Sequence, residues 1–134
     1  MMNIGLYDAV YERFEAFLKE HCPFDIMLLN QPAGEKFPNV VFEEINNTAI
    51  SISDPHSLIS YEINIYAKDK AFDGEMVSSM DVARIISRYS AMFMEQICGF
   101  RRIANKPTPN IDSNIYRITM QYTAKASDTR CHFF

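Results

Sequence analysis

A strict two-residue alternation near the end of the chain constrains the fold more than any other feature of the sequence. Aromatic and apolar residues occupy one set of positions and polar or charged residues the other: Tyr116, Ile118, Met120, Tyr122 and Ala124 against Arg117, Thr119, Gln121, Thr123 and Lys125. A period of two is typical of a β-strand with one buried and one solvated face. We therefore expect a long strand over residues 116–125, in a sheet that is covered on one side.

A second alternation lies in the middle of the chain, over residues 60–68. Tyr61, Ile63, Ile65 and Ala67 form its apolar side, and Glu62, Asn64 and Tyr66 lie on the other. Other segments predict further short strands, which span residues 25–29, 40–45, 48–52 and 100–104, with a turn expected at Asn46-Asn47. The chain is therefore rich in short strands, and the two alternating segments are the longest regular ones.

Two segments have the three-and-four spacing of amphipathic helices. The first runs from Ile4 to about Glu20, with an aromatic stripe. The second runs from about Ser78 to Cys98; Ser78 with Asp81 resembles a capping box, and Gly99 is expected to end the helix in a left-handed conformation. The charged residues 69–74 between strand and second helix are expected to form a mobile loop.

These elements predict an α+β fold in the order α-β-β-α-β-β, to which the shorter strands would add, with both helices on one face of a mostly antiparallel sheet. We expect a single domain over residues 1–125 and a C-terminal extension over residues 126–134 that ends in His132-Phe133-Phe134. The other face of the sheet carries Asn64, Tyr66, Arg117, Thr119 and Gln121, side chains that suit solvent or another subunit.

Composition narrows the class of protein. A chain of 134 residues has the usual size of one domain, and its 48% hydrophobic content is that of an ordinary globular protein. No apolar run is long enough for a transmembrane helix, and the first residues lack the pattern of a secretory signal. Three cysteines at irregular spacing argue against a disulfide framework. A net charge of −4 argues against nucleic-acid binding or membrane attraction as the main activity.

The residues that could carry chemistry form no recognisable catalytic or metal site. His21-Cys22 and Cys131-His132 are adjacent pairs, whereas structural zinc ligands are usually two to four residues apart. Cys98 is interpreted as a small core residue rather than a nucleophile. Four glycines are too few for a backbone phosphate cradle, and no P-loop, GxGxxG or GxSxG pattern occurs. We predict a protein that is not an enzyme and needs no cofactor or metal.

Arg101-Arg102 is the one basic position that stands out, and two interpretations of it stay open. On a strand the two side chains point to opposite faces, so they do not form a patch. They are either edge charges that discourage aggregation or partners in an interface ion pair. Pro107 and Pro109 similarly make the following turn rigid or shape a docking loop.

Several of these segments taken together resemble a family of bacteriophage proteins. SYEINIYAKDK, VSSMDVARII, GFRRIANKPTPN and SNIYRITMQYTAK are similar to the tail-terminator and tail-completion proteins of long-tailed phages, also labelled minor capsid or head–tail joining proteins. The resemblance covers residues 37–125 in element order and local sequence, and none of its motifs is catalytic. It implies a small α+β subunit that assembles into a ring, usually of six copies.

In that family the ring caps the tail tube, stops its polymerisation and joins the head connector. The resemblance thus implies four partners: other copies of the chain, the tail-tube protein, head connector or neck proteins, and DNA passing through the lumen. It implies a virion protein made in the bacterial cytoplasm. From exposure and rigidity we expect the ring contacts at two sets of residues: Arg101, Arg102, Asn105, Pro107, Pro109 and Asn110, and Asp69, Lys70 and Asp73.

Two other classes of function remain open at the level of the sequence. One is a head-completion or neck component that binds portal or adaptor. The other is a small cellular α+β module, an enzyme or a ligand-binding regulator, that shares the same order of elements. A deep apolar pocket with convergent polar groups would favour the second.

Overall fold

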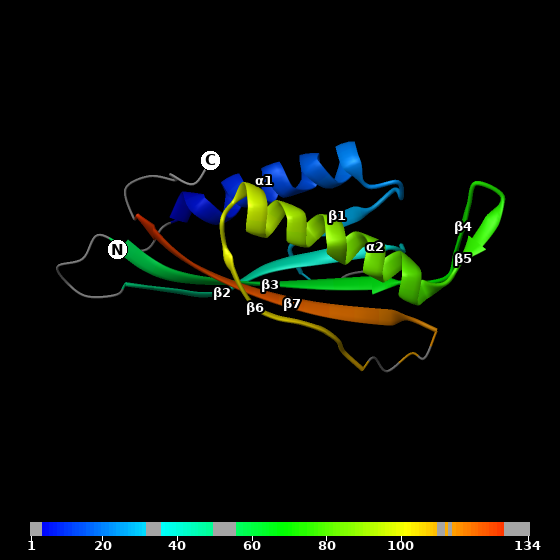
Figure 1. The fold of residues 1–134 in the computed structure, drawn as a ribbon. Coiled ribbons are helices and arrows are strands. Elements are labelled where there is room, and N and C mark those ends of the chain that lie inside the picture. The colour runs from blue at the N-terminus through cyan, green and yellow to red at the C-terminus, as the bar shows by residue number, and fades with distance from the viewer. Residues whose placement is uncertain (1–3, 32–35, 50–55, 110–111, 113, 128–134) are drawn as a thin grey trace.

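Two helices cover one face of a mostly antiparallel sheet in this single-domain protein (Figure 1). The computed structural model describes residues 4–31, 36–49, 56–109, 112 and 114–127. Helix α1 (Ile4–His21) and helix α2 (Ser79–Ala91) lie on the same side of the sheet. The expected α+β class, with two helices and a mostly antiparallel sheet, is confirmed.

Within the described residues, the main sheet has five strands in the order β1-β2-β3-β7-β6. The strands are β1 (Met27–Leu29), β2 (Asn39–Ala49), β3 (His56–Ala67), β6 (Arg101–Pro107) and β7 (Tyr116–Ser127). Among the described strands, only β1 pairs in parallel, with β2, and the other neighbours are antiparallel. The two alternating segments of the sequence are β3 and β7, and they pair with each other at the centre of the sheet. Strands β1 and β6 form the two edges.

The core fills the space between the helices and the sheet. Phe42 of β2 is fully buried and is its aromatic centre, stacked on Tyr7 at 5.2 Å between ring centroids and met edge-on by Phe14 at 5.6 Å. Phe14 also stacks on Phe93 at 5.2 Å, which joins the two helical segments. The apolar side chains of β3 and β7 face this layer, as their alternation predicts, and Tyr61 and Tyr122 lie opposite each other there.

The second helix begins and ends as its sequence predicts, but its last part is a different kind of helix. The Ser78 side chain accepts a hydrogen bond from the Asp81 backbone at 3.2 Å, which caps the N-terminus. After Ala91 the chain continues as a π-helix, η1 (Met92–Ile97). Gly99 follows with a positive φ of 74°, a conformation that glycine adopts without strain.

The full order of elements, α1-β1-β2-β3-β4-β5-α2-η1-β6-β7, differs from the expected α-β-β-α-β-β. The turn expected at Asn46-Asn47 is wrong, because β2 runs through these residues to Ala49 and absorbs a register shift between Glu44 and Asn46. The charged loop expected at residues 69–74 is also wrong in its first part. Those residues begin a hairpin of β4 (Lys70–Phe72) and β5 (Glu75–Val77), closed by Asp73 and Gly74 with φ of 51° and 82°.

The sheet face away from the helices is drier at its centre than the alternation predicts. Asn64 and Thr119 are only 3% and 5% exposed on that face. They are buried because polar side chains lie over one another there: the Asn64 carboxamide oxygen accepts hydrogen bonds from Arg117 Nε at 3.0 Å and Nη2 at 2.9 Å, and from Thr119 Oγ1 at 2.7 Å. The expectation of a solvated face is therefore wrong for these two residues.

Some of the expectations lie at or beyond the limits of the described residues. Strand β7 ends at Ser127, two residues inside the expected C-terminal extension. Residues 50–52 of the strand expected at 48–52, Asn110 and the terminal His132-Phe133-Phe134 lie outside the described residues.

Candidate interaction surfaces

The residues expected to form ring contacts fall into two sets at separate places on the fold (Figure 1). Asp69, Lys70 and Asp73 belong to the β4–β5 hairpin and its base, which project beyond the end of the main sheet. The other described set lies on and just after the edge strand β6. The structure brings together the members of each set but does not join the two sets in one copy of the chain.

Within the hairpin set, each residue has a distinct position. Asp69 lies at the base, where its Oδ1 accepts a hydrogen bond from the Ser79 backbone N–H at 2.7 Å and ties the hairpin to the start of α2. Lys70 pairs with Val77 in the hairpin ladder. Asp73 is the first residue of the two-residue turn, where Asp-Gly suits two successive positive φ angles. Asp69 is therefore a structural residue, while Asp73 is exposed at the tip.

The hairpin also exposes apolar side chains that the sequence analysis did not select. Met76 is 69% exposed, the highest value among the exposed large hydrophobic residues that the structure describes. Phe72 of β4 is also exposed, as is Met80 at the start of α2. The Phe72 ring contacts the body of the protein, edge-on to Phe24 at 5.5 Å between ring centroids. Glu75 adds a second carboxylate next to the turn. The projecting end of the molecule is therefore both acidic and apolar.

Strand β6 is an edge strand on which nearly every residue is exposed. Arg101 pairs with Thr123 of β7, and Arg102 pairs with Tyr122. Since Thr123 and Tyr122 lie on opposite faces of β7, the two arginines are on opposite faces too, as expected. A β-bulge between Arg102 and Ala104 then places Asn105 opposite Met120, on the same helix-covered side as Arg102.

Beyond β6 the expected turn residues leave the sheet. Pro107 is the last residue of the strand, opposite Ile118. Thr108 donates its backbone N–H to the Arg117 carbonyl at 2.8 Å, and its hydroxyl donates to Thr119 Oγ1 at 2.6 Å. Pro109 is exposed. Thr108 therefore anchors the start of this turn to the outer face of the sheet.

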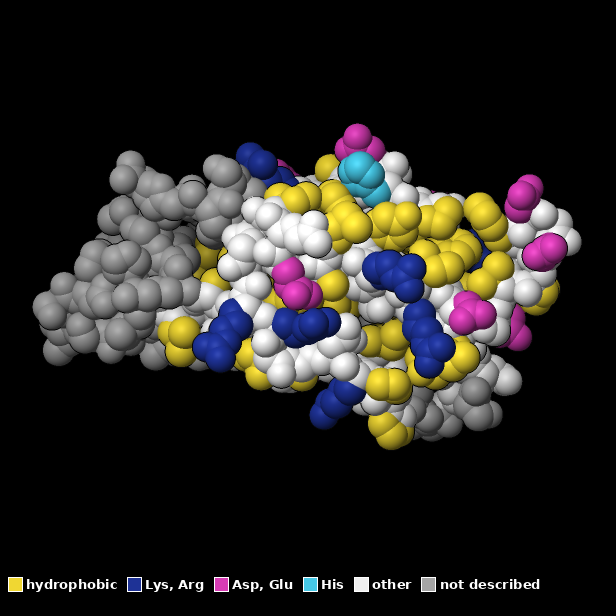
Figure 2. Space-filling model, in the orientation of Figure 1, with side chains coloured by type: hydrophobic (Ala, Val, Ile, Leu, Met, Phe, Trp, Pro, Cys, Tyr) yellow, Lys and Arg dark blue, Asp and Glu magenta, His cyan; other side chains and the backbone are white. Residues whose placement is uncertain are grey.

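A groove of about 540 Å³ lies between α2, η1 and β6, and we call it the arginine groove. Its lining residues are Arg84, Ser87, Arg88, Ala91, Met92, Glu95, Gln96, Arg102 and Asn105. Figure 2 shows Lys and Arg side chains spread across the middle of this side of the molecule, while Asp and Glu side chains gather at the end that carries the hairpin. Sequence reasoning found Arg102 and Asn105 but missed the two arginines of α2.

Of the groove's described lining residues, Glu95 is the only carboxylate, and it is already engaged. Its Oε2 accepts a hydrogen bond from the Tyr122 hydroxyl at 2.9 Å and lies 3.8 Å from Arg102 Nε. Burial is the largest cause that raises the pKa of Tyr122 above its ordinary value, and this hydrogen bond is the second. The hydroxyl therefore stays a donor. Three arginines against one occupied carboxylate leave the groove positively charged.

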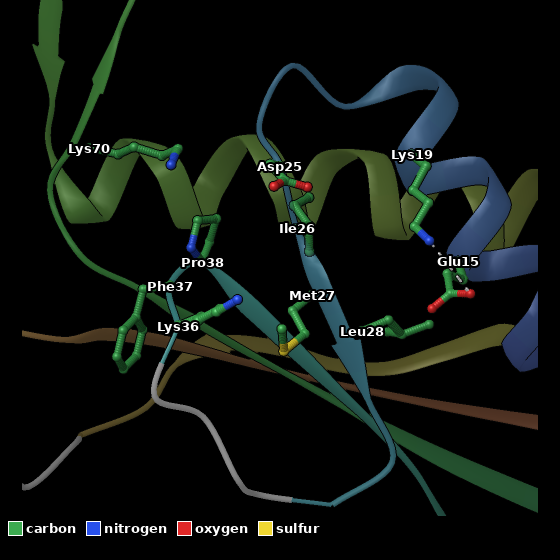
Figure 3. Close-up of a pocket in the computed structure, with 10 residues that line it drawn as sticks. All are labelled: Glu15, Lys19, Asp25, Ile26, Met27, Leu28, Lys36, Phe37, Pro38 and Lys70. Atoms are coloured by element: carbon green, nitrogen blue, oxygen red, sulfur yellow. Dashed lines mark ion pairs between the residues drawn. The ribbon is translucent and has the colours of Figure 1, made fainter.

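A second groove, of about 510 Å³, lies between the end of α1, β1 and the segment that precedes β2 (Figure 3). Lys19, Lys36 and Lys70 line it together with Glu15 and Asp25. Lys19 and Glu15 form an ion pair at 3.9 Å. Because both signs of charge occur side by side, this groove shows no clear preference for an anion or a cation.

No group of three or more His, Cys, Asp or Glu residues within the described segments is placed to hold a metal ion. Burial raises the pKa of the Cys98 thiol to about 12. No described helix is long and apolar enough to cross a membrane. No protein-family model matches the chain, and no curated protein matches it.

Proposed function

We propose that this chain is a structural protein of a long-tailed bacteriophage or prophage, a tail terminator that acts as a ring. The resemblance stated for the sequence supports this class, and the segments that carry it include most of β3 and β7 and all of the edge strand β6. The observation that carries the proposal is the presence of two different exposed patches, the acidic hairpin and the basic β6 edge, at separate places on one fold. Two unlike patches allow each copy to bind the next in a head-to-tail ring.

In this role the ring, of about six copies by the resemblance, caps the tail tube and prevents further growth of the tube. The opposite side of the ring forms the tail-side joint to the head connector. DNA passes through the lumen, and a net charge of −4 limits adhesion of its phosphates. The protein is made in the bacterial cytoplasm and is incorporated into the virion.

The test is native mass over a concentration series, alone and with purified tail-tube protein. We expect a closed ring, either free or formed on the tube, and specific retention of the chain by tail-tube protein. The Arg102→Glu variant should weaken assembly and keep its circular dichroism spectrum, because Arg102 is half exposed and its ion pair with Glu95 is long. Lys106→Glu is the matched control, since Lys106 pairs with Thr119 and lies on the other face of β6.

The same experiment separates this proposal from its alternatives. Retention by portal or adaptor in place of tail-tube protein would assign the chain to the neck. A chain that stays monomeric in every mixture, and binds neither tube nor connector, would overturn the structural role altogether.

A further inference from the structure

We propose that the β4–β5 hairpin of one copy inserts into the arginine groove of the next copy. This inference rests on the proposed ring and names the contact that would build it. It uses residues that the sequence analysis did not select: Glu75 and Met76 on the hairpin, and Arg84, Arg88 and Met92 in the groove.

The β4–β5 hairpin has features that favour binding to another protein surface. Among the described strands, β4 and β5 pair only with each other, and an isolated two-stranded hairpin is at best marginally stable in water. Its side-chain anchors to the body include the Asp69–Ser79 hydrogen bond and the Phe24–Phe72 ring contact. The exposed Met76 at its end offers apolar surface beyond what the chain itself covers.

Charge selects the groove as the complementary surface. The hairpin tip carries Asp73 and Glu75, while Arg84, Arg88 and Arg102 line the groove. Arg84 and Arg88 are one helical turn apart on α2, so their side chains lie on one face. The second groove, shown in Figure 3, carries mixed charge and includes Lys70 of the hairpin itself, so it does not offer the same match.

The proposed contact also has an apolar part, between a methionine of the hairpin and a methionine of the groove. Met92 is exposed in η1 and lines the groove next to Ala91. Methionine side chains are flexible and adapt to one another, so Met76 of one copy can pack against Met92 of the next. The contact joins two different surfaces, so it can repeat from copy to copy as a heterologous interface and build a closed ring.

Cysteine cross-linking of the full chain tests this contact even when association is weak. The tested chain carries Met76→Cys and Met92→Cys, with Cys131→Ser to remove the third native thiol; Cys22 and Cys98 are buried. Under mild oxidation we expect a ladder of disulfide-linked oligomers. Linking should be on the order of a hundredfold faster than for a control chain with Met76→Cys and Lys106→Cys, because docking raises the effective concentration of the two thiols.

A second pair of substitutions tests the charge match. Arg84→Ser with Arg88→Ser should abolish the ladder while leaving the circular dichroism spectrum unchanged, because both arginines are exposed. A ladder no stronger than that of the control chain would overturn the inference, and so would linking of Met76→Cys to tail-tube protein in place of another copy. Either result leaves the proposed function standing if the chain still forms a ring or caps the tube.

Discussion

On the helix side of the β3–β7 pair, Tyr61 and Tyr122 are buried beneath α1 and α2, whereas on the opposite side Asn64 and Thr119 are buried without a described helix above them. The first face excludes water with aromatic and aliphatic side chains. The second does so with a polar cluster, in which Arg117 lies over Asn64 and Thr119 hydrogen-bonds both Asn64 and Thr108. A period of two separates the faces of a sheet, but it does not determine how each face is covered.

The largest expected effect comes from removing the aromatic centre of the helix side. Phe42→Ala deletes a fully buried ring that contacts Tyr7, Tyr11, Phe14 and Tyr61. We expect a loss of about 3–5 kcal/mol in the free energy of unfolding, measured by urea denaturation. Phe42→Leu keeps more of the volume and should lose less. A loss below about 1 kcal/mol for Phe42→Ala would contradict the packing described.

On the outer face, Asn64→Ala should remove the acceptor shared by Arg117 and Thr119. Because hydrogen bonds to a charged group contribute about 1.5–3 kcal/mol, we expect a loss of about 2–3 kcal/mol in unfolding free energy. Asn64→Asp keeps the acceptor oxygens beside Arg117 and should retain most of the stability. If Asn64→Leu proves as stable as the natural chain, the polar cluster is not what holds this face together.

Burial on the helix side also predicts that the free energy of unfolding falls at alkaline pH. Burial raises the pKa of Cys98 from 9.0 to about 12, so folding favours the neutral thiol. The stabilising contribution is complete below pH 9 and is lost as pH rises toward 12, at about 1.4 kcal/mol per pH unit. Urea denaturation at pH 8, 9 and 10 should show this loss, and Cys98→Ala should reduce it. Burial also raises the pKa of Cys22, Tyr7, Tyr11 and Tyr122, so these groups should leave a smaller loss in the variant. An equal slope in the variant would assign the loss to other groups.

The smallest effect is expected at the solvated part of the outer face. Gln121 Nε2 donates to Glu62 Oε1 at 3.3 Å, and both side chains are half-buried. Gln121→Ala should change the unfolding free energy by about 0.5 kcal/mol or less, since water replaces the lost partner. A change as large as that of Asn64→Ala would show that the polar cluster extends further than its hydrogen bonds indicate.

Local patterns in the sequence predicted the elements whose signals are themselves local. The alternation of β3 and β7, the Ser78 cap and the Gly99 stop each depend on neighbouring residues, and the structure confirms them. The turn expected at Asn46-Asn47 was wrong because pairing with β3 keeps these residues extended, and such tertiary pairing overrides local turn preference.

Sequence reasoning missed two further features, the β4–β5 hairpin and the arginine groove. The hairpin had a signal in the sequence and the groove did not. The β4–β5 hairpin had one, because Asp73-Gly74 is a strong turn pair, but each of its two strands is only three residues long, too short for an alternation to be recognised. The arginine groove had no such signal in the sequence. Arg84 and Arg88 line the same groove as Arg102 because α2 crosses the sheet beside β6, a relation between segments that composition and spacing do not encode.

The bulge in β6 has a consequence for how this chain tolerates insertion and deletion. In a regular strand, losing one residue turns every later side chain to the opposite face. Here Ile103, which is 58% exposed, is the extra residue between Arg102 and Ala104. It has no partner in the ladder with β7. Deleting Ile103 would leave Arg102 and Asn105 on the groove side and Arg101 on the other. The edge strand can therefore shorten by one residue in the course of evolution without exchanging its two surfaces.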